Sequence, residues 1–223
     1  MKKIMLAAAT IAAAAPAYAD LNHGEEKNAE DPTKIITRAG AGWTNNGVRF
    51  NGSLGLDETR MINVSITDDG DEWSVGGSWL FDIGILNVDV RKSDYGDGNI
   101  NTSYSAGTYL PLESHPWGWM PFVTFGYSYN DGETMEDGVK EKVRSHAGYL
   151  GMFAIKPINE SWTGIAVVGT TQGQNNYSSY WGGAGISHQL TENQSVNLIG
   201  IAVDSSLYGS DQRVNLNYRY EFK

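Results

Sequence analysis

The last segment of the chain, from Val214 to Phe222, alternates strictly between apolar and polar residues. Val, Leu, Tyr, Tyr and Phe occupy one set of alternate positions, and Asn, Asn, Arg and Glu occupy the other. Because successive side chains of a β-strand point to opposite faces, this pattern predicts a strand with one apolar and one polar surface. Such a strand suits a soluble sandwich, with its polar face in water, or a transmembrane barrel, with its apolar face in lipid and its polar face toward the lumen.

Residues 1–19 have the pattern of a cleaved secretory signal. Two lysines near the N-terminus precede an apolar stretch from Ile4 to Ala15, and an Ala-Tyr-Ala cleavage site ends the segment. The apolar stretch is shorter than the about 20 residues that a membrane-spanning helix needs. We therefore expect an exported chain whose mature form begins at Asp20.

Composition narrows the classes of function. None of the 223 residues is cysteine, so disulfides do not hold an exported chain of this length together. Removing residues 1–19 takes away two of the 16 basic residues and none of the 26 acidic ones, which leaves a net charge of −12. This acidity argues against nucleic acid or an anionic membrane surface as a partner. The 27 Gly, 7 Trp and 12 Tyr favour a barrel, in which only alternate strand residues need to be apolar.

The rest of the sequence indicates one all-β domain. Residues 20–33 are charged and without periodicity, which predicts a flexible periplasmic lead-in. From residue 34 to 223, strand-length runs alternate with turn signals, and no run has a helical period. We predict a transmembrane, antiparallel, up-and-down β-barrel of about twelve strands, with eight or ten strands as alternatives. The predicted strands are 35–43, 47–56, 60–67, 72–82, 84–91, 99–110, 120–129, 146–155, 161–170, 179–189, 195–203 and 212–222.

The connections between these strands fall into two classes. With the C-terminal end in the periplasm, the periplasmic turns are 57–59, 82–83, 111–119, 156–160 and 190–194, and the longer, acidic connections lie outside the cell. Aromatic residues gather near the predicted strand ends, which is typical of an interfacial girdle. They are Trp43, Trp73, Tyr109, Trp117, Trp119, Trp162, Tyr177, Tyr180, Trp181, Tyr218 and Phe222.

With its signal, its alternating strands and its aromatic-rich last strand, the chain resembles the Gram-negative outer-membrane β-barrel proteins. The resemblance covers essentially everything after the signal. It implies an outer-membrane location, contact with outer-membrane lipid and lipopolysaccharide, and insertion by the barrel-assembly machinery. The last strand resembles the family's assembly signal, with Tyr218, Tyr220 and Phe222 as its aromatic positions. Members usually end on the aromatic residue, whereas Lys223 follows Phe222 here.

Few residues suggest catalysis or metal binding. The pairs Ser145-His146 and Ser187-His188 cannot form a dyad within themselves, because neighbours on a strand point to opposite faces. The acidic run at 68–72 lacks the spacing of a calcium loop. We therefore expect no enzyme, no catalytic residue, no metal and no cofactor. A lipid hydrolase or rim protease completed by a cross-strand partner is a third alternative.

The polar faces of the strands form the candidate site. Their charged and amide side chains would line a water-filled bore, or would pair with one another and fill a closed barrel. We predict a monomer that acts as a narrow passive channel for small polar solutes. The alternative is a non-conducting structural barrel whose acidic outer loops contact lipopolysaccharide, divalent ions or another surface protein. The predicted lumen-lining residues are Arg49, Asn51, Asn63, Asn87, Asp89, Arg91, Asn101, Arg213, Asn215, Asn217, Arg219 and Glu221.

Overall fold

The structure is a computed structural model that describes residues 27–45, 47–94, 100–136, 139–175, 177–206 and 209–222. The predicted signal and residues 20–26 of the predicted lead-in lie outside these ranges.

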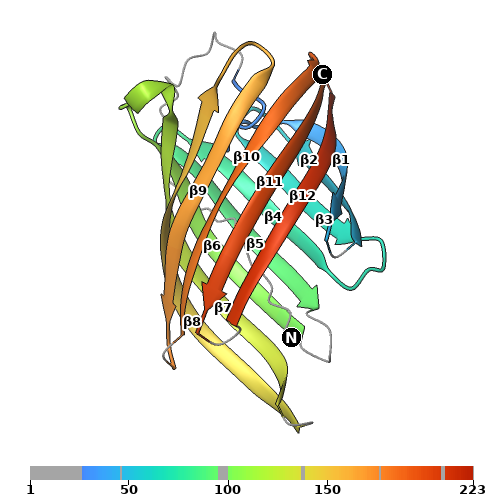
Figure 1. The fold of residues 1–223 in the computed structure, drawn as a ribbon, viewed down its shortest axis with the longest axis vertical. Coiled ribbons are helices and arrows are strands. Elements are labelled where there is room, and N and C mark those ends of the chain that lie inside the picture. Colours follow the sequence, from blue (N-terminus) through green and yellow to red (C-terminus); the bar gives the residue numbers. More distant parts are fainter. Residues whose placement is uncertain are drawn as a thin grey trace.

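The described residues form a closed barrel of antiparallel strands, in which each strand pairs with its neighbours in sequence and β1 pairs with β12 (Figure 1). The predicted all-β, twelve-stranded barrel is confirmed, and the alternatives of eight and ten strands are wrong. The strands are β1 (Thr37–Thr44), β2 (Gly47–Gly55), β3 (Arg60–Thr67), β4 (Trp73–Phe81), β5 (Gly84–Asp94), β6 (Ile100–Pro111), β7 (Met120–Glu136), β8 (Val139–Pro157), β9 (Trp162–Gly173), β10 (Ser178–Thr191), β11 (Gln194–Ser205) and β12 (Gly209–Phe222). A short 3-10 turn, η1 (Pro116–Gly118), lies between β6 and β7.

Strands β7 and β8 run well past their predicted ends and form a long hairpin, which projects from the lower end of the barrel in Figure 1. Ion pairs cross its ladder: Lys140 Nζ lies 2.9 Å from Glu133 Oε2, and Arg144 Nε lies 3.3 Å from Asp131 Oδ1. Opposite charges on facing strands stabilise a hairpin without an apolar face. Residues 130–145 therefore lack the alternation that would have predicted these strand ends.

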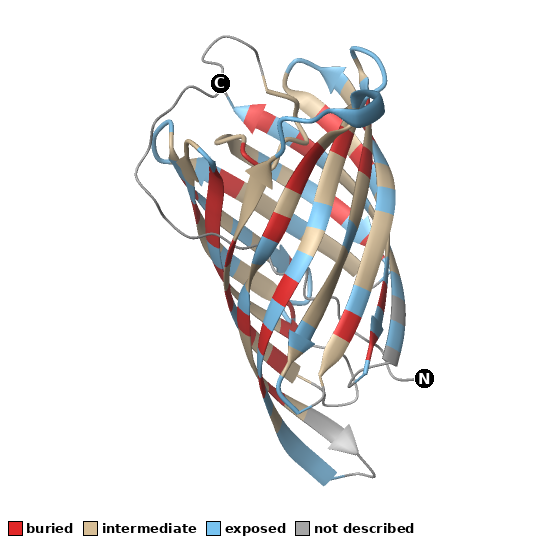
Figure 2. Cartoon of the chain, turned by 90° about the vertical axis from the view of Figure 1, so that its left-hand side faces the viewer, coloured by how far each residue is buried: buried red, intermediate tan, exposed pale blue. Residues whose placement is uncertain are grey.

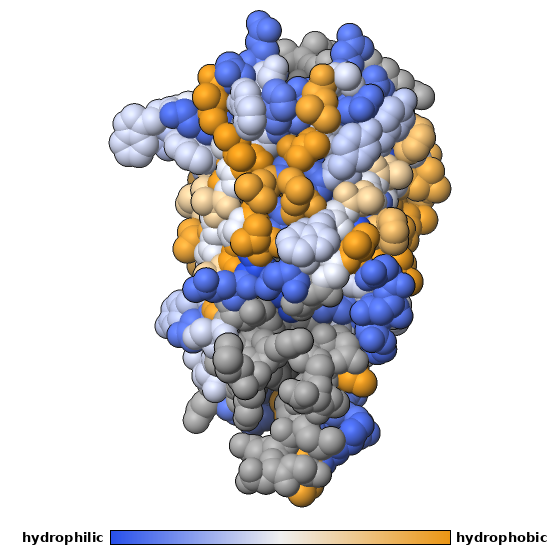
Figure 3. All heavy atoms as spheres, turned by 45° about the vertical axis from the view of Figure 1, so that its right-hand side comes forward, coloured by the Kyte–Doolittle hydropathy of each residue, from blue (hydrophilic) through white to orange (hydrophobic). Residues whose placement is uncertain are grey.

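The outer wall of the barrel is apolar. Along strands such as β1, β3 and β12, exposed residues alternate with buried or half-buried ones (Figure 2). The exposed positions include Val64, Leu198 and Leu216, each with nearly half of its side-chain surface accessible. Figure 3 shows apolar side chains gathered in a belt, with hydrophilic residues above and below it. A belt of this kind matches a lipid-facing surface, since soluble monomers rarely expose apolar patches of such extent.

No helix in the described part of the chain is long and apolar enough to cross a membrane.

One side of the lumen is filled by apolar side chains. Phe122, Ile155 and Ile165 are buried on the inner faces of β7, β8 and β9. The partly buried Tyr109 and Phe153 pack against this cluster, with their ring centroids 6.1 Å apart. The lumen therefore has an apolar cluster on one side, beside buried polar residues of the same strands such as Thr124, Ser145 and Thr163.

Two aromatic residues expected in the girdle point inward instead. Tyr109 joins the apolar cluster, and Trp181 lies against Gly151 and Gly169 on the neighbouring strands. A Cβ atom on Gly151 would come within 2.4 Å of the Trp181 ring, and one on Gly169 within 2.1 Å. The two glycines thus leave the space that the indole occupies. Both residues were assigned to the girdle because they lie near strand ends, but that position does not determine whether a side chain points to lipid or to the lumen.

The lipid-facing role of Leu216 can be tested by placing a charge there. Leu216→Arg should destabilise the folded barrel, at a cost of up to about 2–4 kcal/mol, because an Arg on the lipid-facing belt loses its hydration. Urea unfolding of the protein in lipid vesicles measures this change. Val139, also apolar and exposed, lies on the projecting hairpin and supplies the control. Val139→Arg should change stability by less than about 0.5 kcal/mol; equal costs at the two positions would argue against the lipid belt.

Candidate functional site: the barrel lumen

The predicted lumen-lining residues occupy the less exposed of the two alternating faces of β2, β3, β5, β6 and β12. Asn87, Asp89, Asn101, Arg219 and Glu221 are buried, and the other seven are half-buried.

Hydrogen bonds join the amides among them to facing strands. Asn51 Nδ2 donates to Asn217 Oδ1 at 2.9 Å, and Asn63 Nδ2 donates to Ser78 Oγ at 2.8 Å. Asn101 Nδ2 donates to the Oδ1 atom of Asn130 at 3.2 Å. The predicted residues thus lie on the less exposed faces of their strands, and hydrogen bonds link three of their amides to other polar side chains.

A cavity of about 320 Å³ lies in the bore beside this lining; we call it the lower cavity. Its polar side includes Arg38, a residue of β1 that the sequence analysis missed. Arg38 shares its face of β1 with Gly40 and Gly42, so the alternation of that strand could have revealed it. Apolar groups of Met61, Tyr109 and Phe153 complete the wall, and the polar lining residues include Arg38, Asn51, Asn63, Asn87, Asp89 and Arg91.

A second cavity, of about 140 Å³, lies nearer the outer loops; we call it the upper cavity, although Figure 1 draws this end of the barrel at the bottom. Arg49, Arg91 and Arg213 reach it from three strands. Glu72 forms ion pairs with two of them: its Oε2 contacts Arg49, and its Oε1 lies 3.9 Å from Arg213 Nη1. Glu72 belongs to the acidic run at 68–72, and we missed its inward position because the run had the composition of a solvated loop.

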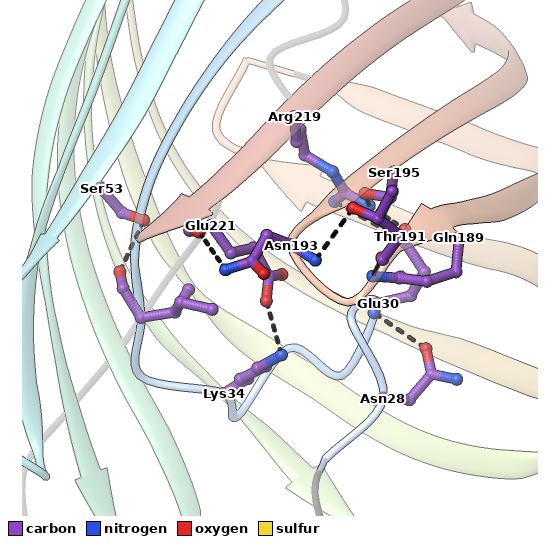
Figure 4. A network of polar contacts seen from close by, with 11 residues as sticks. Asn28, Glu30, Lys34, Ser53, Gln189, Thr191, Asn193, Ser195, Arg219 and Glu221 are labelled. Atoms are coloured by element: carbon purple, nitrogen blue, oxygen red, sulfur yellow. Dashed lines mark hydrogen bonds and ion pairs between the residues drawn. The ribbon is translucent and has the colours of Figure 1, made fainter. Parts of the chain in front are cut away.

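Residues 27–36 lie inside the end of the barrel that holds the C-terminus of β12, and Figure 4 shows their contacts. We call them the inner segment. Asn28 Nδ2 donates to Thr163 Oγ1 of β9 at 2.9 Å, and Lys34 Nζ lies 2.9 Å from Glu221 Oε2 of β12. Between them, the Glu30 carboxylate pairs with Arg219, whose Nη1 lies 3.1 Å from Oε2. The inner segment is therefore anchored to strands far apart along the wall.

Residues 27–33 belong to the predicted lead-in, and their charged, aperiodic sequence carries no signal for these contacts. The partners of Asn28, Glu30 and Lys34 lie 135 to 189 residues away in sequence. Only the closed barrel brings them together.

The ion pair of Glu30 is shielded from water. The side chains of Glu30 and Arg219 are each only 7% exposed. Burial acts to raise the pKa of the Glu30 carboxyl, but the charge of Arg219 and hydrogen bonds from Arg219 and Ser187 outweigh it and hold the pKa below the ordinary value of 4.5. Glu30 is thus ionised at neutral pH, and its pairing with Arg219 weakens only as the pH falls through this lowered pKa.

Neither His146 nor His188 lines these two cavities. His146 contacts the Tyr127 hydroxyl, and His188 stacks on Trp162 with ring centroids 4.2 Å apart. The preceding serines, Ser145 and Ser187, are buried while His146 is exposed and His188 half-buried, which agrees with opposite faces. In the described ranges, no three His, Asp or Glu side chains gather closely enough to hold a metal ion.

The predicted assembly positions, Tyr218, Tyr220 and Phe222, lie on the exposed face of β12. Tyr220 and Phe222 pack edge to face, with centroids 5.0 Å apart. Recognition of these three residues by the barrel-assembly machinery stays a prediction.

Solved structures share this arrangement of strands. The translocator domain of the autotransporter NalP from Neisseria meningitidis matches with a TM-score of 0.59 and 12% identity, over 83% of this chain and 86% of that one. An outer-membrane channel from Pseudomonas putida F1 matches with a TM-score of 0.54 and 10% identity, over 88% of this chain and all of that one. The fold is that of the bacterial outer-membrane β-barrels.

The porin NanC is similar to this outer-membrane barrel as well, with a TM-score of 0.51 and 11% identity over 84% of this chain and 99% of that one. No family model matches the sequence, and no curated protein matches it. The resemblance inferred from the sequence is thus confirmed for the fold. Together with the apolar belt, it supports a location in the outer membrane.

The anchoring of the inner segment by Glu30 can be tested with trypsin. Glu30→Gln leaves Arg219 buried without its carboxylate, which typically costs about 3–5 kcal/mol and should release the segment. Lys34, which pairs with Glu221 in the folded protein, should then be cleaved much faster than in the wild type. Mass spectrometry of the refolded barrel after brief digestion gives the rates.

Glu58→Gln is the matched control, because Glu58 is exposed in a turn. It should leave the cleavage rate at Lys34 unchanged. Equally fast cleavage in the wild type would show that the segment is not held in the bore.

Proposed function

We propose that this outer-membrane barrel is a narrow passive channel for small polar solutes. The observation that carries the proposal is the succession of two cavities along the polar side of the bore, of about 320 and 140 Å³, which share Arg91 as a lining residue. A solute that enters one cavity is therefore beside the next.

The lining can replace the hydration shell of such a solute. Amides of Asn51, Asn63 and Asn87 offer both donors and acceptors, and the neighbouring Arg and Asp side chains set the local field. Apolar side chains around Phe122 and Ile155 pack one side of the lumen, so passage is restricted to the polar side. Selection would rest on size and hydrogen bonding, without a reaction.

The inner segment narrows the exit from the lower cavity. Pro32 is part of that cavity's wall, and the anchors at Glu30 and Lys34 hold the chain on either side of it. Displacement of residues 27–36 would widen the channel. In this proposal the inner segment forms the constriction of the channel.

The second candidate is a closed structural barrel with acidic outer loops that contact lipopolysaccharide, divalent ions or another surface protein. The observation that favours it is the filling of the bore, by the cluster around Phe122, Ile155 and Ile165 on one side and by the inner segment at one end. A closed barrel predicts no ion current even when the segment is removed. A lipid hydrolase would instead show activity that is lost in His146→Ala or His188→Ala.

The proposed setting of the channel is a monomer in outer-membrane lipid and lipopolysaccharide, inserted by the barrel-assembly machinery. The closed strand ladder leaves no unpaired edge that would need a second copy.

Planar-bilayer recordings of the mature chain, residues 20–223, test the channel. We expect steady conductance steps, and larger steps after deletion of residues 27–34, because the constriction is then gone. Heat-modifiable mobility on a gel verifies that each variant is a folded barrel. Folded barrels that carry no current, with or without residues 27–34, would overturn the channel in favour of the closed structural barrel.

Acid should widen the channel through Glu30. The ion pair is intact at neutral pH and is lost as the pH falls through the lowered pKa of Glu30, below 4.5. The charged groups that face Glu30 are Arg219 and Arg38. Wild-type step size should rise toward that of the deletion variant below pH 4.5, while Glu30→Gln should already be wide at pH 7. Identical pH profiles for the two proteins would refute this role of Glu30.

A further inference from the structure

We infer that the upper cavity is a binding site for a small anionic solute, such as a carboxylate, on its way through the bore. The inference rests on the proposed channel and names the class of solute that the channel prefers.

The charge of the bore differs in sign from that of the whole chain. The mature chain is strongly acidic, but many of its acidic residues lie in the outer loops. The charged residues that line the upper cavity are Arg49, Arg91, Lys92 and Arg213 against the single carboxylate of Glu72. Asp89, which pairs with Arg91, lies outside this cavity and lines the lower one. The local balance is therefore positive, and a low-dielectric wall focuses such a field on a solute.

The arginines are held in place while part of their donor capacity stays available. Glu72 bridges Arg49 and Arg213, and Asp89 Oδ1 lies 3.7 Å from Arg91 Nη2. The side chains of Arg49, Arg91 and Arg213 remain 25%, 15% and 15% exposed, so part of each guanidinium faces the cavity. A guanidinium presents its N–H groups in a planar fork that matches a carboxylate, so a carboxylate in the cavity could bind the accessible N–H groups.

Apolar side chains beside these arginines set the size and character of the ligand. Ile199 and Ile201 line the upper cavity from β11 and exclude water from one side. The attraction between guanidinium and carboxylate is stronger there than in bulk water. A volume of about 140 Å³ holds a carboxylate with a few attached carbon atoms, one at a time.

Basic groups continue below the upper cavity. Arg91 also lines the lower cavity, and Arg38 lies on that cavity's wall. An anion released from the upper cavity thus meets another guanidinium before it reaches the inner segment. Binding that is shared between successive weak sites allows passage without trapping the solute.

The test is the reversal potential of single channels of residues 20–223 in a KCl gradient, followed by block with added succinate. We expect chloride to be preferred over potassium, and succinate to interrupt the chloride current. Arg91→Gln should weaken the succinate block about tenfold, the effect of losing one charge-assisted hydrogen bond. Glu72→Gln removes a competing carboxylate and should shift the reversal potential further toward chloride.

Arg144→Gln is the matched control, since Arg144 carries the same charge on the exposed outer hairpin. It should leave both the selectivity and the block unchanged. Channels that conduct without chloride preference, or that respond equally to Arg91→Gln and Arg144→Gln, would overturn the anion site and leave the channel intact. Folded barrels that never conduct would instead overturn the channel itself.

Discussion

Closure of the strand ladder between β1 and β12 is the constraint on which the rest of the structure depends. In lipid, every backbone N–H and C=O group needs a protein partner, so a sheet can span the membrane only as a closed barrel. The seam pairs Thr37 with Phe222 and continues without interruption to Thr44 with Asn215. Gly40 makes this seam fit: a Cβ atom there would lie 2.8 Å from the Tyr218 carbonyl oxygen and 3.2 Å from the Arg219 side chain. A small residue on β1 thus leaves room for a large polar one on β12.

Closure also determines where the charges go. Because the outer face must be apolar, arginines and carboxylates of the strands are turned into a confined bore, where an unpaired charge is costly. Ion pairs inside the bore offset this cost, such as those of Glu72 with Arg49 and of Glu30 with Arg219. The second pair joins the chain's N-terminal region to its last strand. The proposed channel, its constriction and its anion site are three consequences of this one arrangement.

The sequence predicted those features that the alternation of lipid and lumen imposes on every strand. All twelve strands and the short turns between them were predicted because a two-residue period is a strong local signal. The alternation is not required where the hairpin of β7 and β8 projects beyond the barrel, and the strand ends there were not predicted. Ion pairs stabilise that part of the hairpin without an apolar face. Trp181 was placed on the wrong face because its inward position depends on Gly151 and Gly169 of neighbouring strands. The contacts of Glu30, Glu72 and Arg38 likewise depend on register around the barrel, which no local pattern contains.

The central claim is that the polar face of the strands borders water and the apolar face borders lipid. The chain has no cysteine, so single cysteines can report on each face. Asn63 lines the lower cavity, and Ile62, its neighbour on β3, is 41% exposed on the outer wall. In proteoliposomes, a charged, membrane-impermeant thiol reagent should label Asn63→Cys readily and leave Ile62→Cys unlabelled. Labelling of Ile62→Cys but not Asn63→Cys would contradict the account.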